Sequence, residues 1–309
     1  MKHLKKYVAL ILSVLLLTSL LAACKGKEST DTPAGDAGDK ATVESTGDGE
    51  DTADSGTSEY PEDVQAIIDR GVLRVGVKNA VIGFGYQDPL TQEYSGLEIT
   101  LANKIAEHLG VEVEFTAVTA ATRTELLDSG DIDCVLATFT ITDERKESWD
   151  FSSPYYTDYV TVLVENASGI TSLEGLKDKK VGVSSGSTSA KALVKAMIDG
   201  GFISGDSFNE DTFDPALWTE GVSFHQYDDY PTISTALSAG EIDAFCVDKS
   251  ILAAYNSEGR SYIADKFSPQ DYGVATKKGS GLTSVVEGLI TGWLSDGTIG
   301  GLITENGLE

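Results

Sequence analysis

Apolar residues beyond residue 60 alternate between the spacing of strands and the spacing of helices. The run Leu73–Val77 predicts a short strand. In residues 97–110 the apolar side chains recur every three or four positions and a glycine ends the run, which predicts an amphipathic helix. Residues 111–116 alternate between apolar and polar, as a half-buried strand does, and residues 122–129 predict a second short helix. This order favours a mostly parallel sheet with helices on its faces.

A second unit of the same type follows an apolar strand over residues 159–164. Residues 180–198 predict a strand, a glycine-containing turn and a helix. The segments 124–137 and 233–246 share one pattern, because both run from a helix through a glycine and an acidic-Ile-Asp step into an apolar strand. Two similar units predict an α/β fold of two lobes, each with a mixed, mostly parallel sheet flanked by helices. Ligands of open α/β sheets bind at the carboxyl ends of the strands, so we expect a ligand cleft between the lobes.

The N-terminal segment has the pattern of an export signal. Residues 1–23 combine a basic start, a continuous apolar run and small residues at the end, as a secretory signal peptide does. The four residues LAAC that end at Cys24 resemble the lipobox of bacterial lipoproteins, in which this cysteine receives a diacylglycerol anchor. A signal-anchor helix with an incidental cysteine is the alternative. Residues 24–60 are acidic and nearly free of large apolar side chains, so we expect a lipid-anchored, disordered linker.

The formal net charge of -26 at pH 7 comes in large part from this acidic linker. It argues against a nucleic-acid partner, because neutralising phosphates needs clustered lysine and arginine. Cys134 and Cys246 each lie in an apolar run, which predicts two buried thiols and no disulfide framework. His108 and His225 are isolated in the sequence, so we expect neither a metal site nor a cofactor.

A carboxylate site is indicated where the first repeated strand ends. Thr138 and Thr140 follow that strand, and Arg145 falls in the first turn of a helix that Thr142 is expected to begin. A buried arginine without a partner is costly, so an anion is expected beside it. Hydroxyl groups, free N–H groups at a helix start and a guanidinium together form a site for a carboxylate.

The other lobe offers complementary groups. Ser187 and Thr188 at the start of its helix can add N–H donors from across the cleft, and the Asp248 carboxylate suits an ammonium group. An anion clamp and a lone carboxylate in one pocket match the zwitterion of an α-amino acid. Two alternatives stay open: Arg145 could pair with a surface carboxylate on an ordinary capped helix, and Asp248 could cap a helix that begins at Ser250.

Residues 71–278 resemble the polar-amino-acid family of extracytoplasmic solute-binding proteins, which feed ABC importers. The resemblance rests on the motif ATFTITDERK, which begins at Ala137, and on DFSSPY, which begins at Asp150. It implies a two-lobed type II periplasmic-binding-protein fold. It also implies that Thr140, Arg145 and Thr188 hold the α-carboxylate of the ligand and that Asp248 receives the α-amino group.

Three further stretches resemble the members of this family that bind aspartate or glutamate. They are KNAVIGFGY from Lys78, TAATR up to Arg123, and YDDYP from Tyr227. In those members a lysine and an arginine at the places of Lys78 and Arg123 meet the side-chain carboxylate of the ligand. Such cations would repel a basic ligand and leave a buried charge unmatched by a neutral one. The alternatives are a solvated lysine at a strand end and an arginine on a helix surface.

Aromatic residues are the candidates for the walls of the site. Phe84, Tyr86 and Tyr230 can exclude water with their rings, and the hydroxyl groups of the two tyrosines can reach the ligand. Simple loop packing is the alternative for the first two. The sequence lacks the tryptophan-containing ending that is common in the family, which leaves the last helix open but affects none of the candidate residues.

The sequence therefore predicts a monomeric, lipid-anchored substrate-binding protein on the extracytoplasmic face of a bacterial membrane. It would bind L-glutamate or L-aspartate by lobe closure and deliver the ligand to the permease subunits of an ABC importer. Lobe 1 is expected to comprise residues 61–160 and 270–309, and lobe 2 residues 161–269.

Three other functions are compatible with the same fold. The first is a binding protein for glutamine or another polar amino acid. The second is a dehydratase acting on a prephenate-like acid, which is disfavoured because the sequence has no nucleophile with an adjacent base and no nucleotide-binding loop. The third is a module that presents its ligand to a membrane sensor, which would use the same closure.

Overall fold

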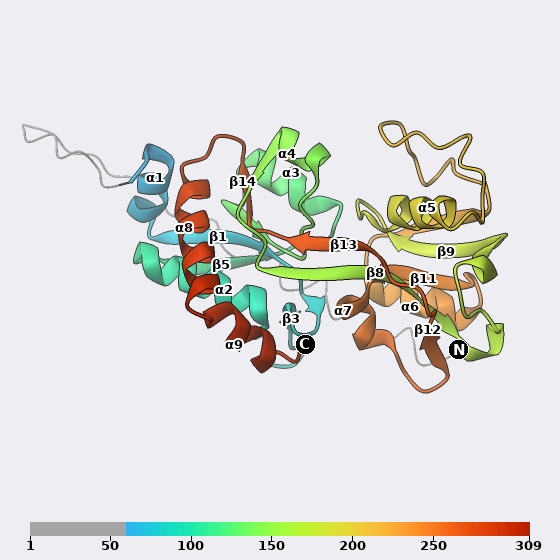
Figure 1. The fold of residues 1–309 in the computed structure, drawn as a ribbon. Helices are drawn as coiled ribbons and strands as arrows, with labels where there is room; N and C mark the ends of the chain where they lie inside the picture. Colours follow the sequence, from blue (N-terminus) through green and yellow to red (C-terminus); the bar gives the residue numbers. More distant parts are fainter. Residues whose placement is uncertain (1–59) are drawn as a thin grey trace, which may run out of the picture. The chain divides into compact units, whose positions relative to one another are not determined.

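Residues 60–309 are described by a computed structural model, drawn as a ribbon in Figure 1. The expected signal peptide, the Cys24 anchor and the acidic linker lie outside these residues. Two larger mixed sheets and one small sheet are present in the described part of the chain, with helices against the larger sheets. The predicted α/β class is thus confirmed.

The first sheet contains the strand that the sequence predicts over Leu73–Val77, with a parallel strand on each side of it. Its strand order is β5-β1-β6-β14-β7, with β1 parallel to β5 and β6, and β14 antiparallel to β6 and β7. The bounds are β1 (Val72–Val77), β5 (Glu112–Ala117), β6 (Cys134–Leu136), β7 (Trp149–Phe151) and β14 (Ala275–Lys277). A small sheet leads into it, with β2 (Ala80–Val81), β3 (Gly85–Gln87) and β4 (Tyr94–Ser95).

Two of the helices around the first sheet, over residues 97–109 and 122–129, match the helices predicted from the sequence. The helix expected over residues 97–110 ends where Gly110 adopts φ 68°, a left-handed conformation that glycine takes without steric cost. Its apolar side packs on the sheet, with Leu101, Ile105 and Leu109 buried. The helices are α1 (Glu62–Arg70), α2 (Leu97–Leu109), α3 (Thr122–Ser129), α4 (Asp143–Ser148), α8 (Leu282–Ser295) and α9 (Thr298–Glu305).

The second sheet has the order β10-β9-β11-β8-β12, and β13 also pairs with β8. Strand β9 is parallel to β10 and β11, whereas β8 is antiparallel to its three partners. The strands are β8 (Tyr156–Glu165), β9 (Lys179–Ser184), β10 (Val222–Tyr227), β11 (Ala244–Asp248), β12 (Arg260–Tyr262) and β13 (Phe267–Tyr272). The helices are α5 (Ser189–Asp199), α6 (Tyr230–Ala239) and α7 (Lys249–Leu252), with three 3-10 turns, η1 (Asn166–Ser168), η2 (Glu174–Leu176) and η3 (Ala253–Tyr255).

Strand β11 shows how this sheet is covered on both faces. Ala244 and Cys246 lie in the apolar cluster that contains the side chains of α5, whereas Phe245 and Val247 lie in the cluster that contains α6. Successive side chains of a strand point to opposite faces, so the two helices cover opposite sides of the sheet (Figure 1). Cys134 and Cys246 are both buried and unpaired, as predicted.

The chain passes between the two larger sheets at β8 and β13, paired strands of the second sheet that lie side by side in Figure 1. The first sheet takes its strands from residues 72–151 and 275–277, and the second takes all of its strands from residues 156–272. The lobe boundary at residue 160 stays a prediction, because β8 continues through it from Tyr156 to Glu165.

The C-terminal end, which the sequence left open, is helical. Helix α9 ends at Glu305, Leu308 is buried beyond it, and the Tyr156 hydroxyl donates to the Leu308 carbonyl at 2.9 Å. No helix within residues 60–309 is long and apolar enough to span a bilayer.

Candidate ligand-binding site

Arg145 lies in helix α4 and reaches both lobes. Thr142 is the N-cap of this helix, and its hydroxyl accepts from the Arg145 N–H at 3.1 Å. The guanidinium donates to the Thr140 carbonyl at 2.7 Å and to the Gly186 carbonyl, ahead of α5, at 3.1 Å. The capped helix is therefore present, but within residues 60–309 Arg145 forms no salt bridge with a carboxylate.

The Arg145 guanidinium is charged at neutral pH despite its surroundings. Burial, and next the nearby Arg123, lower its pKa to about 9. Gly186, which receives one of its bonds, has φ 73°, and a Cβ on it would come within 2.8 Å of the Ala120 carbonyl oxygen. Glycine is thus required where the two lobes touch beside Arg145.

Arg123 comes from α3 and is buried, with 3% of its surface exposed. One of its terminal nitrogens donates to the carbonyls of Ala137 at 2.9 Å and Thr138 at 3.2 Å, while its buried Nε has no partner among the described residues. The guanidinium carbon lies 3.8 Å from the centre of the Phe139 ring, and that of Arg145 lies 4.7 Å from the same ring. Burial lowers the Arg123 pKa to about 10, so the side chain is still a cation. The alternative of a surface arginine is wrong.

Lys78 follows strand β1 and is also buried, with 4% exposure, so the alternative of a solvated lysine is wrong. Its Nζ lies 5.7 Å from the centre of the Tyr230 ring. Burial holds the Lys78 pKa well below its ordinary value, Arg123 lowers it further, and the carboxylates of Glu98 and Asp248 oppose this. Among the described residues no carboxylate forms a salt bridge with Lys78.

Glu98 is a buried acid that the sequence analysis missed. Its Oε1 accepts from the Thr138 N–H at 2.5 Å and from the Tyr155 hydroxyl at 2.6 Å. Its Oε2 is buried and has no partner in the part of the chain that the structure describes. Burial raises the Glu98 pKa, against the effect of these hydrogen bonds and of Lys78. The sequence could have predicted this burial, because Glu98 lies one turn before Ala102 and therefore on the apolar face of α2.

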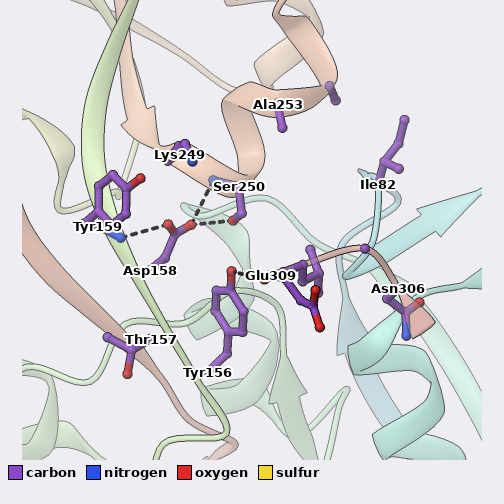
Figure 2. Close-up of a pocket in the computed structure, with 13 residues that line it drawn as sticks. Ile82, Tyr156, Thr157, Asp158, Tyr159, Lys249, Ser250, Ala253, Asn306 and Glu309 are labelled. Atoms are coloured by element: carbon purple, nitrogen blue, oxygen red, sulfur yellow. Dashed lines mark hydrogen bonds between the residues drawn. The ribbon is translucent and has the colours of Figure 1, made fainter. Parts of the chain in front are cut away.

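Asp248 ends strand β11 and is the N-cap residue of α7, but its side chain makes no capping bond. Its Oδ2 accepts from the Tyr272 hydroxyl at 2.5 Å, and its buried Oδ1 has no partner within residues 60–309. Burial, and next the charge of Asp158, raise the Asp248 pKa to about 7. The start of α7 is instead held by Asp158, which accepts from the N–H of Ser250 at 3.1 Å and from its hydroxyl (Figure 2).

The candidate hydroxyls are divided between different partners. Thr140 and Thr188 both donate to the amide oxygen of Gln270, at 2.8 and 2.7 Å, and Gln270 is a second residue that the sequence analysis missed. The Thr138 hydroxyl donates to the Ala137 carbonyl at 2.9 Å. The buried Ser187 hydroxyl has no partner.

Thr138 has φ 46°, a conformation that is rare and strained for a β-branched residue. Its N–H is held by Glu98 and its carbonyl by Arg123, which stabilise this strained turn directly after β6. The two charged side chains therefore also shape the backbone that leads to Thr140.

The aromatic candidates have different positions. Tyr230 begins α6, lies beside Lys78 and is buried, and burial followed by the charge of Asp248 raises its pKa. Phe84 is fully buried and packs edge-on against Tyr156 and Tyr272, with ring centres 5.0 and 5.7 Å away. Tyr86 is half-buried in the small sheet, where it pairs with Ala80 and Ser95, and it does not line the cavity described next.

A cavity of about 600 Å³ lies between the two lobes at this place. Of the candidates it is lined by Arg123, Arg145, Ser187 and Thr188, and the other charged candidates are buried. At its edge the Lys191 ammonium on α5 forms a salt bridge of 2.8 Å with Glu144 on α4. The second cavity, drawn in Figure 2, has about 590 Å³, is lined by Asp158, Lys249 and Ser250 among others, and contains none of the candidates.

Three cationic side chains and two carboxylic side chains thus converge on the region behind and beside the first cavity. They are Lys78, Arg123, Arg145, Glu98 and Asp248. Within residues 60–309 no group of three or more potential metal ligands is present. The arrangement can hold a small molecule that carries both charges.

The comparisons with known proteins agree with this fold. The glutamine-binding protein of an ABC transporter from Bacillus subtilis is 31% identical over 95% of this chain and 94% of its own length. The glutamate-binding protein of Corynebacterium efficiens is 28% identical over 81% of this chain and 84% of its own. The structure of an ancestral arginine-binding protein bound to arginine matches with a TM-score of 0.64 and 33% identity, over 76% of this chain and 98% of that one.

These relatives are all binding proteins, and the three are named for three different amino acids. The model of one protein family matches residues 73–304, which include every candidate residue for the ligand. The chain belongs to the bacterial extracellular solute-binding proteins, family 3.

Proposed function

We propose that this protein binds an acidic L-amino acid, glutamate or aspartate, on the extracytoplasmic face of a bacterial membrane and delivers it to an ABC importer. Family membership supports transport of a small solute, and the names of the relatives support an amino acid. We further propose that the two lobes close around the ligand and that Cys24 carries the lipid that anchors a monomeric protein.

The α-amino acid end of the ligand is assigned to Arg145 and Asp248. The Arg145 guanidinium lines the cavity and is the natural partner of the α-carboxylate. The unpartnered Oδ1 of Asp248 supports a contact with the α-ammonium, because a buried oxygen without a donor is costly and an ammonium supplies one. Ser187, whose buried hydroxyl also lacks a partner, can donate to the carboxylate.

The observation that carries the acidic ligand is the burial of Lys78 and Arg123 without a carboxylate in salt-bridge contact within residues 60–309. With all five charged side chains ionised, the three cations exceed Glu98 and Asp248 by one positive charge. Glutamate and aspartate carry one net negative charge at neutral pH, so they neutralise the excess, whereas glutamine leaves it buried.

Glutamine is the second candidate, and the name of the Bacillus subtilis relative favours it. Glutamine matches glutamate in size, and its amide oxygen can accept a hydrogen bond from Lys78 or Arg123. The cost of burying an unneutralised charge is what separates the two ligands. In this proposal Lys78 and Arg123 both contact the side-chain carboxylate of the acidic ligand.

A calorimetric titration of the full chain, purified in detergent, with each of the twenty common amino acids tests this proposal. We expect heat from glutamate or aspartate at micromolar protein, and affinities at least tenfold weaker for glutamine and asparagine. A preference for glutamine would refute the acidic ligand while leaving amino-acid binding in place. Silence across the panel would contradict amino-acid binding, and turnover of a prephenate-like acid would then support the dehydratase.

A further inference from the structure

Gln270 in strand β13 joins three segments at the centre of the molecule. It is buried, with 2% of its surface exposed. Its Oε1 accepts from the hydroxyl of Thr140, at 2.8 Å, and from that of Thr188, at 2.7 Å. Its Nε2 donates to the carbonyl and the hydroxyl oxygen of Ser268, at 3.0 and 3.1 Å.

The orientation of this amide follows from its partners. The Ser268 carbonyl can only accept, so the amide nitrogen has to face it and the amide oxygen has to face the two threonines. An amide oxygen only accepts, and each hydroxyl has a single proton. The hydroxyl protons of Thr140 and Thr188 are therefore both held by Gln270.

The two threonines belong to different lobes. Thr140 follows β6 of the first sheet and forms an isolated bridge with Tyr272, and Thr188 is the N-cap residue of α5 beside the second sheet. Gln270 lies between them on the strand that pairs with β8. Its amide oxygen thus links the two lobes.

The backbone under Gln270 is held in an unusual conformation. Ser268 has φ 48°, and the pairing of β13 with β8 shifts register between Phe267 and Pro269. Both bonds of the Gln270 amide nitrogen go to this residue, so the amide fixes the irregular strand and is fixed by it. A flexible surface glutamine would have neither constraint.

We propose that Gln270 is a positioning residue of the amino-acid site, which holds the hydroxyl protons of Thr140 and Thr188 and so ties the lobes together behind the ligand. With their protons held, the two hydroxyl oxygens can only accept from a ligand, which suits its ammonium end. The carboxylate is then left to Arg145 and to the free hydroxyl of Ser187. This inference rests on the proposed function, because it concerns the part of the ligand that all amino acids share.

Gln270→Met tests it, because methionine has a similar length and neither accepts nor donates as an amide does. We measure L-glutamate and L-glutamine binding to the full chain by calorimetry. Affinity for each ligand should fall about tenfold, equivalent to about 1.4 kcal/mol, and the ratio between the two ligands should stay constant. Gln92→Met, in an exposed loop, is the matched control and should leave both affinities unchanged.

A double-mutant cycle separates positioning from a general loss of structure. Thr188→Val should weaken binding clearly less in the Gln270→Met background than in the wild type, because the bond between the two side chains can be lost only once. Additive losses would overturn the inference, and so would an unchanged affinity of Gln270→Met.

Two further outcomes have fixed meanings. A wild type that binds neither ligand overturns the proposed function and this inference with it, whereas a wild type that binds while Gln270→Met is unaffected overturns the inference alone. If Gln270→Met loses cooperative thermal melting, Thr140→Val and Thr188→Val in the wild type decide the question. Each must weaken both ligands by the same factor, and an unequal or absent effect rejects the proposal.

Discussion

Replacing Arg123 by methionine probes the charge of the site with little change in its shape. Methionine keeps an apolar stem that can pack near Phe139, where the guanidinium carbon lies 3.8 Å from the ring centre. The substitution removes a buried cation whose Nε has no partner, together with two hydrogen bonds to backbone carbonyls. If Arg123 meets the side-chain carboxylate of the ligand, glutamate then has only Lys78 to neutralise that carboxylate.

The size of the effect follows from two opposing contributions. Breaking one side of a buried ion pair costs on the order of 3 to 5 kcal/mol. Against this, Arg123 lowers the pKa of Lys78, so its removal leaves the lysine more fully protonated and better able to compensate. We therefore expect a loss of about 2 to 3 kcal/mol for glutamate, which corresponds to roughly 30- to 150-fold in the dissociation constant.

The amide ligand serves as the internal reference. Glutamine can accept only a hydrogen bond from the Arg123 cation, and the variant no longer has to bury that cation beside a neutral side chain, so the dissociation constant for glutamine should change by less than about fivefold. The preference for glutamate over glutamine should therefore narrow by at least a factor of about six. Lys78→Met should also reduce the preference for glutamate over glutamine.

Calorimetric titrations of both ligands, at one ionic strength and pH, measure this ratio. Arg74→Met is the matched control, because Arg74 bonds Asp133 at 2.8 Å in a half-exposed pair outside the cavity. The control should leave both affinities as they are. The reasoning is refuted if both Arg123→Met and Lys78→Met keep the full preference for glutamate, or if the wild type prefers glutamine.

Four other predictions use the same protein. Arg145→Ala and Asp248→Ala should each weaken every amino-acid ligand alike, by about 2 to 5 kcal/mol in titrations, and a selective loss would contradict their assignment to the shared α-amino acid end. Because the Asp248 pKa is raised to about 7 and an ammonium partner favours its ionised form, binding should release a proton and weaken below pH 7, as titrations in buffers of different ionisation enthalpy can measure. Because the Asp248 pKa is higher in the folded protein, protonation of this side chain contributes to the free energy of unfolding. The contribution is complete below pH 3.8, the ordinary pKa of an aspartate, and is lost as pH rises through 7. Asp248→Asn cannot ionise, so it should melt at a higher temperature than the wild type at pH 8. Cys24→Ala should leave the protein uncleaved or released from membranes, and an unmodified Cys24 found by mass spectrometry in mature, membrane-bound protein would exclude the anchor.

The burial of the site was predictable in part. Sequence motifs identified Arg145 and Asp248 as charged groups at the ends of two repeated strands, and the structure brings both to the region between the lobes. The sequence could not decide between solvent and burial for Lys78 and Arg123. Burial depends on which residues cover a side chain in the folded protein. Tyr230, which is remote in sequence, lies beside Lys78, and Phe139 lies against Arg123.

The amino-acid sequence by itself determined the elements and their class. The helix at 97–109 with its glycine stop, the repeated helix-strand segments and the two buried thiols depend on periodicity and on local backbone preferences, which neighbouring residues fix. Only the tertiary structure decided the roles of Glu98 and Gln270. Their partners lie 40 positions away, at Thr138, and 130 and 82 positions away, at Thr140 and Thr188. A carboxylate or an amide acquires such partners only when separate strands assemble, because the cost of burying it unpaired is what selects the arrangement.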